Sequence, residues 1–126
     1  MPSRLILATH NAGKLGELRR LFGEWDVELQ SIGGLGAAAP EETADTFVGN
    51  ALLKAHAAAR AFDSVALGDD GGLVVPRLGG LPGVHSSRWV AKQGGWEAGR
   101  KELVQQAGLR DGPRRRVEAT LFCALA

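Results

Sequence analysis

The chain has 126 residues, a length that fits one domain with a core of its own. Its 15 lysines and arginines nearly balance 14 aspartates and glutamates, so no strong overall charge draws it to nucleic acid or to an anionic membrane. The single cysteine, Cys123, excludes an internal disulfide bond, and no apolar run approaches the length of a membrane span. We therefore expect a soluble, cytoplasmic protein with one domain over residues 1–126.

The first third of the chain alternates between strand and helix patterns. Residues 4–8 form a compact apolar run that is typical of a buried strand. Residues 14–22 carry leucines at helical spacing, and Gly23 ends this predicted helix. Residues 27–32 alternate between apolar and polar side chains and indicate a second strand. Residues 33–40, rich in glycine and alanine without any period, predict a loop.

The longest helical pattern covers residues 46–62, with Asp45 or Thr46 as its cap. Small alanines on its apolar face would let the helix lie close to a sheet. The expected packing face contains Phe47, Ala51, Leu52, Ala55, Ala59 and Phe62. Asn50 and Lys54 lie four positions apart, so they share a helix face and could reach one ligand together.

The rest of the chain predicts short strands, one helix and glycine-rich connections. The expected elements are a strand at 65–67, a break at 68–72, a strand at 73–75, a loop at 79–83, a helix at 96–107 stopped by Gly108, and a final strand at 117–126. The basic run at 114–116 is interpreted as a solvated connection, and Cys123 as a buried structural thiol.

Strands that alternate with helices predict an α/β fold, a central sheet flanked by helices. Ligands of such sheets gather at the carboxyl ends of the strands, so polar clusters that follow two strands are expected to share one cleft. The sequence stops inside an apolar segment, residues 121–126, which would leave an exposed edge strand. We therefore expect the N-terminal portion of a longer protein, poorly soluble and weakly active or inactive by itself.

The first polar cluster, residues 9–14, follows the first strand and opens the first helix. Backbone N–H groups at a helix start, the helix dipole and Lys14 would together favour a phosphate group. The alternative is that Asn11 only caps the helix and Lys14 is solvated. A zinc site is not expected, because His10, His56 and His85 lack ligand spacing.

The second polar cluster contains Asp69 and Asp70, directly after a strand and before two glycines. Carboxylates are the ligands that Mg²⁺ prefers, and only one of two adjacent extended residues is expected to face a shared cleft. The alternative is an acidic turn. Glu41 or Glu42 could complete a metal site with Asp70 or only complement the dipole of the following helix. Together, the two clusters supply what a magnesium–triphosphate complex requires.

Several motifs in this order resemble the non-canonical purine nucleoside triphosphate pyrophosphatases, also called inosine triphosphate pyrophosphatases or XTP/dITP diphosphatases. The resemblance covers nearly the whole chain, because each motif stands at the family's spacing. The matching segments are Leu7-Ala8-Thr9-His10-Asn11-Ala12-Gly13-Lys14, Glu41-Glu42-Thr43, Thr46-Phe47, Asn50-Ala51-Leu52-Leu53-Lys54-Ala55, Asp69-Asp70-Gly71-Gly72-Leu73 and Gly79-Gly80-Leu81-Pro82-Gly83-Val84, followed by Ser86 and Arg88.

The resemblance implies a Mg²⁺-dependent hydrolase that cleaves ITP, dITP and XTP to the monophosphate and pyrophosphate, so that these nucleotides stay out of nucleic acids. It implies Glu42 and Asp70 as metal ligands, with Asp70 and Lys14 as catalytic residues. The substrate-binding residues that it implies are Thr9, His10, Asn11, Ala12, Gly13, Lys14, Asn50, Lys54 and Gly71. A cytoplasmic homodimer of the full-length protein is implied as well.

Departures from the family pattern leave other functions open. Gly49 stands where the family usually has glutamate, and Gly71 stands where it usually has serine. The family's later segments, which help to recognise the base, have no counterpart in this sequence, so base selectivity cannot be predicted. The alternatives are a catalytically impaired nucleotide-binding module and a pyrophosphatase of the Maf type, whose N-terminal motif is richer in serine and arginine.

Overall fold

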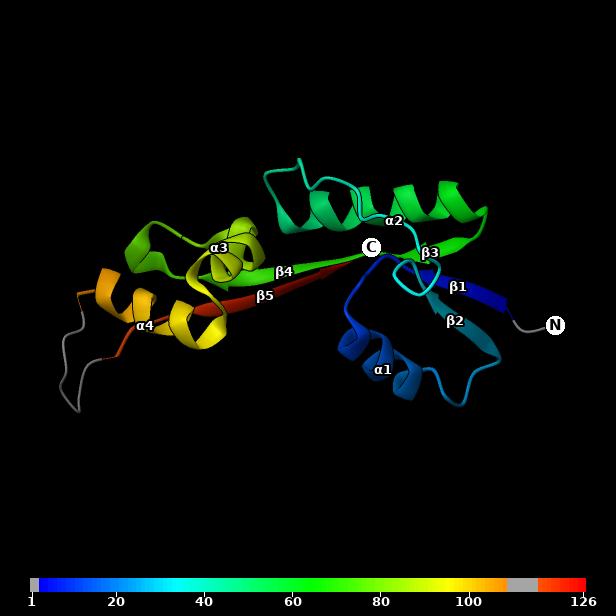
Figure 1. Cartoon of the computed structure of the whole chain (residues 1–126), viewed down its shortest axis with the longest axis horizontal. Coiled ribbons are helices and arrows are strands. Elements are labelled where there is room, and N and C mark those ends of the chain that lie inside the picture. Colours follow the sequence, from blue (N-terminus) through cyan, green and yellow to red (C-terminus); the bar gives the residue numbers. More distant parts are fainter. Residues whose placement is uncertain (1–2, 109–115) are drawn as a thin grey trace. The chain divides into compact units, whose positions relative to one another are not determined.

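A computed structural model describes residues 3–108 and 116–126, which group into two compact units (Figure 1). The first unit comprises Met1–Asp70 with Ala124–Ala126, and the second comprises Gly71–Cys123. The α/β class is confirmed, with the strands divided between a three-stranded and a two-stranded sheet. One domain over residues 1–126 stays a prediction. Arg114 and Arg115 of the basic run lie outside the described residues.

The first unit contains a parallel sheet with the order β2-β1-β3, formed by β1 (Ser3–Leu7), β2 (Val27–Ser31) and β3 (Val65–Leu67). The chain leaves β1 through α1 (Ala12–Leu21) to β2 and returns through α2 (Phe47–Phe62) to β3 on the other side of β1. Because both crossovers are right-handed by general rule, the helices cover opposite faces of the sheet (Figure 1). The direction of winding reverses between β1 and β3, and ligands of such folds collect at that reversal.

The core of the first unit forms between this sheet and α2. Its buried residues are Ile6, Ala8, Ile32 and Ala58, with Ala37, Phe62 and Ala66 packed against them. Ala51 and Ala55 are buried as expected, but placing Leu52 on the packing face is wrong, because 44% of it is exposed. Leu21 of α1 is 74% exposed, and no residue of α1 is fully buried. The core therefore combines large side chains of β1 and of the segment after β2 with small side chains of α2.

Gly68, between β3 and the next strand, brings α2 unusually close to the chain. A Cβ atom at this position would lie 2.2 Å from the carbonyl oxygen of Ala51 and 2.7 Å from the nitrogen of Ala55. Only glycine permits such an approach of two backbones, since any other residue would place its side chain inside the helix. Gly68 thereby holds α2 against the segment that leads directly into Asp69 and Asp70.

The remaining strands, β4 (Asp69–Val74) and β5 (Thr120–Leu125), pair as a two-stranded sheet. The break predicted at residues 68–72 is therefore wrong from Asp69 onward. Pairing with β5 keeps this segment extended despite its glycines, and a Cβ at Gly71 would lie 2.6 Å from the carbonyl oxygen of Phe122. Cys123 is exposed on β5, so the prediction of a buried thiol is wrong.

Between these two strands, the second unit carries short helices. The helix expected at 96–107 is confirmed as α4 (Trp96–Gln106), whereas α3 (Ser86–Gln93) and the single-turn helices Pro76–Leu78 and Gly83–His85 were not predicted. Ser86 ties this region to β4, because its hydroxyl accepts a hydrogen bond from the nitrogen of Leu73 at 2.9 Å.

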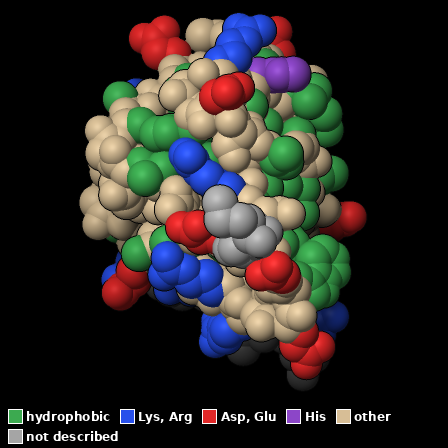
Figure 2. Space-filling model, turned by 90° about the vertical axis from the view of Figure 1, so that its right-hand side faces the viewer, with side chains coloured by type: hydrophobic (Ala, Val, Ile, Leu, Met, Phe, Trp, Pro, Cys, Tyr) green, Lys and Arg blue, Asp and Glu red, His purple; other side chains and the backbone are tan. Residues whose placement is uncertain are grey.

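The surface shown in Figure 2 has acidic and basic side chains interspersed among hydrophobic ones. This mixture matches the near balance of 15 basic and 14 acidic residues. Among the described residues, none of the helices has the length and apolar character needed to cross a membrane.

Candidate active site

The turn after β1 is closed by its own side chains. Asn11 caps α1, and its Oδ1 accepts hydrogen bonds from the nitrogens of Gly13 at 2.9 Å and Lys14 at 3.2 Å. The Thr9 hydroxyl accepts from the nitrogen of Asn11 at 3.1 Å. The N–H groups of Gly13 and Lys14, which the sequence offered to a phosphate group, are therefore bonded to Asn11 in this structure. The cap explains this result, because a side-chain oxygen at this position satisfies the first helical donors.

His10 connects the turn after β1 to the loop after β2. Its Nε2 lies 2.7 Å from the carbonyl oxygen of Ala37, and the ring nitrogen donates in this contact. Ala12 opens α1 directly behind this turn. The loops that follow β1 and β2 are thus joined at the carboxyl end of the sheet.

Lys14 and Asp69 form an ion pair, although 55 positions separate them in the sequence. Lys14 follows β1 and Asp69 follows β3, its neighbour in the parallel sheet, so both residues reach the same edge. The expected convergence of the lysine turn and the aspartate pair is confirmed. The sequence did not predict that Asp69 is the partner of Lys14. Alternation of side chains along an extended segment could have indicated that the two aspartates face different lysines.

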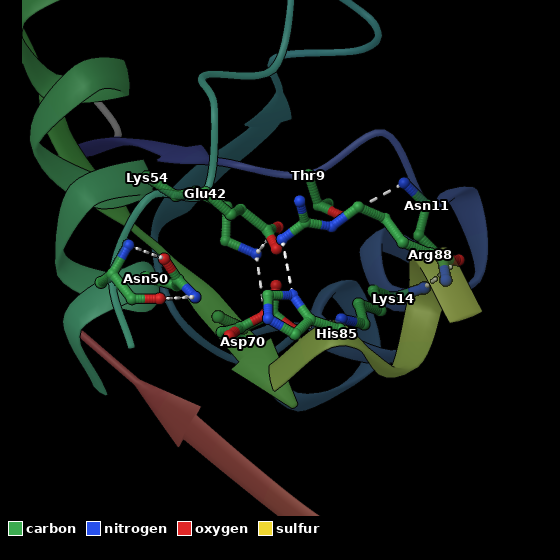
Figure 3. Close-up of polar contacts among 11 residues, drawn as sticks. Thr9, Asn11, Lys14, Glu42, Asn50, Lys54, Asp70, His85 and Arg88 are labelled. Atoms are coloured by element: carbon green, nitrogen blue, oxygen red, sulfur yellow. Dashed lines mark hydrogen bonds and ion pairs between the residues drawn. The ribbon is translucent and has the colours of Figure 1, made fainter. Parts of the chain in front are cut away.

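Lys54 of α2 lies between the carboxylates of Glu42 and Asp70 (Figure 3). Its Nζ is 3.1 Å from Glu42 Oε1 and 3.4 Å from Asp70 Oδ1. The side chain of Lys54 is 12% exposed and that of Asp70 is 8% exposed, so this pair is largely shielded from water, whereas Glu42 is 30% exposed. Three residues that the sequence singled out therefore meet in one place.

Asp70 carries an unusual carboxylate. Its Oδ2 is buried and, in the part of the chain that the structure describes, receives no hydrogen bond. Burial raises the pKa of Asp70 above its ordinary value of 3.8; Lys54 opposes this shift and Glu42 reinforces it. A buried acceptor without a donor is costly to a protein and often marks a functional group.

Asn50 fastens the segment that carries Glu42. Its side chain is completely buried. Its Oδ1 accepts from the nitrogen of Ala44 at 2.9 Å, and its Nδ2 donates to the carbonyl oxygen of Ala44 at 3.2 Å (Figure 3). Both ends of the amide are thus engaged by one backbone residue, two positions beyond Glu42. The expected role of Asn50 in contacting substrate stays a prediction, whereas its contact with Ala44 holds this loop on α2.

We expect Asn50→Ala to lower the free energy of unfolding by about 1–3 kcal/mol, because two backbone groups lose a buried partner. Urea denaturation followed by circular dichroism measures the change. Gln105→Ala, at an exposed position of α4, is the control and should stay within about 0.5 kcal/mol of the unchanged protein. Equal free energies of unfolding for Asn50→Ala and the control would show that the hydrogen bonds between Asn50 and Ala44 contribute nothing to stability.

The donor set at Glu42 and Asp70 fits a magnesium ion. Mg²⁺ typically binds to proteins through one or two carboxylates and fills its other positions with water and phosphate oxygens. The unpartnered Asp70 Oδ2 is an acceptor of the required kind. Within residues 3–108 and 116–126, no three His, Cys, Asp or Glu side chains group as a possible metal cage.

The two departures from the family pattern occupy crowded positions. A Cβ at Gly49 would lie 2.7 Å from the Cβ of Ala44 and 2.8 Å from Oγ1 of Thr46, the residue that caps α2. The crowding at Gly71 comes from the carbonyl oxygen of Phe122. Both sites are adapted to glycine, so neither the missing carboxylate nor the missing hydroxyl could be added without local movement.

Fold and site together define an α/β protein of the doubly wound type, with paired lysines and carboxylates at the carboxyl ends of β1 and β3. The chain belongs to the Ham1 family, whose model matches residues 5–126. This membership confirms the resemblance seen in the motifs.

Curated relatives named dITP/XTP pyrophosphatases are similar to the chain in sequence. The chain is 46% identical over 116 residues to a dITP/XTP pyrophosphatase of Rhodopseudomonas palustris, covering 90% of this chain and 55% of that protein. It is 40% identical over 122 residues to a dITP/XTP pyrophosphatase of Halorhodospira halophila, covering 97% of this chain and 60% of the relative. The chain thus spans between about half and two thirds of the length of these relatives.

Solved structures agree with the fold. A HAM1 protein from Coxiella burnetii is 32% identical, with a TM-score of 0.79 over 98% of this chain and 61% of that chain. A nucleoside-triphosphatase, or dITP/XTP pyrophosphatase, from Mycobacterium abscessus is 33% identical, with a TM-score of 0.73 over 97% of this chain and 63% of that chain.

Proposed function

We propose that the chain carries the phosphate- and metal-binding part of a Mg²⁺-dependent pyrophosphatase that converts ITP, dITP and XTP to the monophosphate and pyrophosphate. The observation that carries the proposal is the cluster of Glu42, Lys54 and Asp70 beside the ion pair of Lys14 and Asp69. The names of the relatives support the substrate class. A homodimer and a cytoplasmic location belong to the same proposal and rest on the family resemblance.

The proposed chemistry assigns one task to each side chain. Water forms a bond to the α-phosphorus, the anhydride bond to the β-phosphate breaks, and pyrophosphate leaves. One oxygen of the Asp70 carboxylate accepts the proton of the attacking water, which leaves its other oxygen for the metal ion. Lys14 and Lys54 offset the charge of the phosphates. Glu42 and Asp70 would hold Mg²⁺, which supplies positive charge against the leaving group.

The residues from Thr9 to Lys14 are proposed to contact the triphosphate, with Asn50, Lys54 and Gly71 as further substrate-binding residues. Support comes from the position of this turn at the carboxyl end of β1 and from the ion pair that joins it to Asp69. A phosphate group would compete with Asp69 for the ammonium group of Lys14. It would also compete with Asn11 for the nitrogens of Gly13 and Lys14.

Pyrophosphate release from ITP, XTP and GTP, with and without Mg²⁺, tests the proposal. We expect Mg²⁺-dependent release from ITP and XTP, and weak release from the 126-residue chain by itself. A chimera that continues beyond Ala126 with the C-terminal part of the Rhodopseudomonas palustris relative should release pyrophosphate faster. Absence of Mg²⁺-dependent release from both proteins would contradict the proposal.

A second candidate, a nucleotide-binding module without turnover, is favoured by Gly49, which cannot supply the carboxylate that the family usually has there. Calorimetric titration with ITP distinguishes the two functions. Binding of ITP by the chimera without any release of pyrophosphate would favour the module, whereas binding with release would favour the enzyme.

A further inference from the structure

Lys54 occupies the position between the two carboxylates that are proposed to hold Mg²⁺. Its ammonium group lies 3.1 Å from Glu42 Oε1 and 3.4 Å from Asp70 Oδ1. A cation held by the same two carboxylates would be within a few ångströms of this ammonium group. At that distance two positive charges repel each other strongly in a site that excludes water.

Burial of Lys54 and Asp70 strengthens the competition between the ammonium group and a metal ion. Only 12% of the Lys54 side chain and 8% of the Asp70 side chain are exposed, so water screens their interaction poorly. The lysine is anchored by its place on α2, which Gly68 holds close to the strand end. Its ammonium group has to change partners when another cation binds to Glu42 and Asp70.

We propose that Lys54 is an internal counter-cation that keeps divalent metal affinity low until the phosphates of a nucleotide draw its ammonium group away. Triphosphate and metal then bind cooperatively, because phosphate oxygens become the new partners of Lys54 as Glu42 and Asp70 are released. Linkage requires the effect to be mutual, so bound Mg²⁺ also strengthens the binding of triphosphate. The inference rests on the proposed function only in taking Glu42 and Asp70 as metal ligands.

Titration of the nucleotide-free 126-residue chain with MgCl₂ by isothermal calorimetry tests this inference. We expect Lys54→Gln to bind Mg²⁺ roughly tenfold more tightly than the unchanged protein, a typical size for coupling between sites. Lys54→Arg, which keeps the charge, should retain the weak affinity. Lys101→Gln is the matched control, because Lys101 pairs with Glu97 at 3.2 Å on an exposed helix surface.

A second measurement uses the unchanged protein, so it does not depend on the folding of a variant. In protein labelled with ¹³C-lysine, the Cε signal of Lys54 should shift during the MgCl₂ titration, while that of Lys101 stays in place. Addition of a non-hydrolysable triphosphate analogue should lower the concentration of Mg²⁺ needed for half of the shift.

Equal Mg²⁺ affinity of the unchanged protein and folded Lys54→Gln would overturn the inference and leave the proposed function standing. A Lys54 signal that stays in place while Mg²⁺ binds would overturn it as well. If neither the unchanged protein nor Lys54→Gln binds Mg²⁺, both the inference and the proposed metal site fail.

Discussion

Asp70→Asn is expected to lower pyrophosphate release from ITP by about 10²- to 10⁴-fold while raising the melting temperature of the protein. The loss follows from the proposed role of Asp70, because an amide cannot accept the proton of the attacking water and is a poor ligand for Mg²⁺. The gain in stability follows from the cost of burying a charge that is only partly compensated. Activity and stability should therefore move in opposite directions.

The sign of the stability effect comes from the pKa of Asp70, which burial raises above 3.8 in the folded state. The folded protein holds this proton more tightly than the unfolded chain. As pH rises above 3.8, the unfolded chain releases the proton first, so the contribution of Asp70 to folding stability falls. The decline is complete once the folded carboxyl has also ionised. We therefore expect the charged Asp70 to lower folding stability at neutral pH, and asparagine to remove that cost.

Calorimetric melting at pH 7 and at acid pH checks the argument. The increase in melting temperature of Asp70→Asn over the unchanged protein should be present at pH 7 and shrink as pH approaches 3.8. Asp26→Asn, at an exposed position outside the site, is the control and should leave both melting and pyrophosphate release unchanged. A lower melting temperature of Asp70→Asn at pH 7 would refute the stability argument, and full activity would refute the role as base.

Gly68→Ala is the substitution expected to harm the fold most. The added Cβ would lie 2.2 Å from the carbonyl oxygen of Ala51 and 2.7 Å from the nitrogen of Ala55. Both atoms belong to the backbone of α2 and cannot rotate away, so the helix itself must move. Overpacking of this kind costs about 3 kcal/mol or more when the surroundings cannot adjust, a large share of the stability of a small domain.

Urea denaturation compares Gly68→Ala with Gly16→Ala. Gly16 lies within α1, and a Cβ there would meet nothing within 4 Å. Alanine is the better helix former, so Gly16→Ala should stabilise the protein by up to about 1 kcal/mol. Because α2 carries Lys54, any folded Gly68→Ala protein should also lose the ion pairs of Lys54. Similar unfolding midpoints for the two variants would contradict the close packing at Gly68.

Local features of the sequence predicted most of the first unit. The apolar run at 4–8, the alternation at 27–32 and the helical pattern at 46–62 correspond to β1, β2 and α2 within one or two residues at each end. Caps at Asn11 and Thr46 could be recognised because a cap acts on donors only two or three residues away. The motifs also indicated the family, since their order and spacing are properties of the sequence itself.

Contacts between distant residues were less predictable. The acidic, glycine-rich segment at 68–72 resembled a turn, but pairing with β5, about 50 positions later, made it part of β4. Likewise, Cys123 and Leu52 have apolar neighbours in sequence, yet the packing of their elements leaves both exposed. Exposure depends on what covers a side chain in space, and neighbours in sequence do not report this.

The sequence alone determined the order of strands and helices in the first unit, the caps of α1 and α2, the family and the residue types available for phosphate and metal chemistry, because each of these depends on local pattern. The tertiary structure decided the partners: Asp69 for Lys14, both Glu42 and Asp70 for Lys54, and Ala44 for Asn50. Ion pairs and buried hydrogen bonds depend on distance through space and on exclusion of water. For Lys54 and Asn50, both are set when α2 packs closely at Gly68, and neither can be read from spacing along the chain.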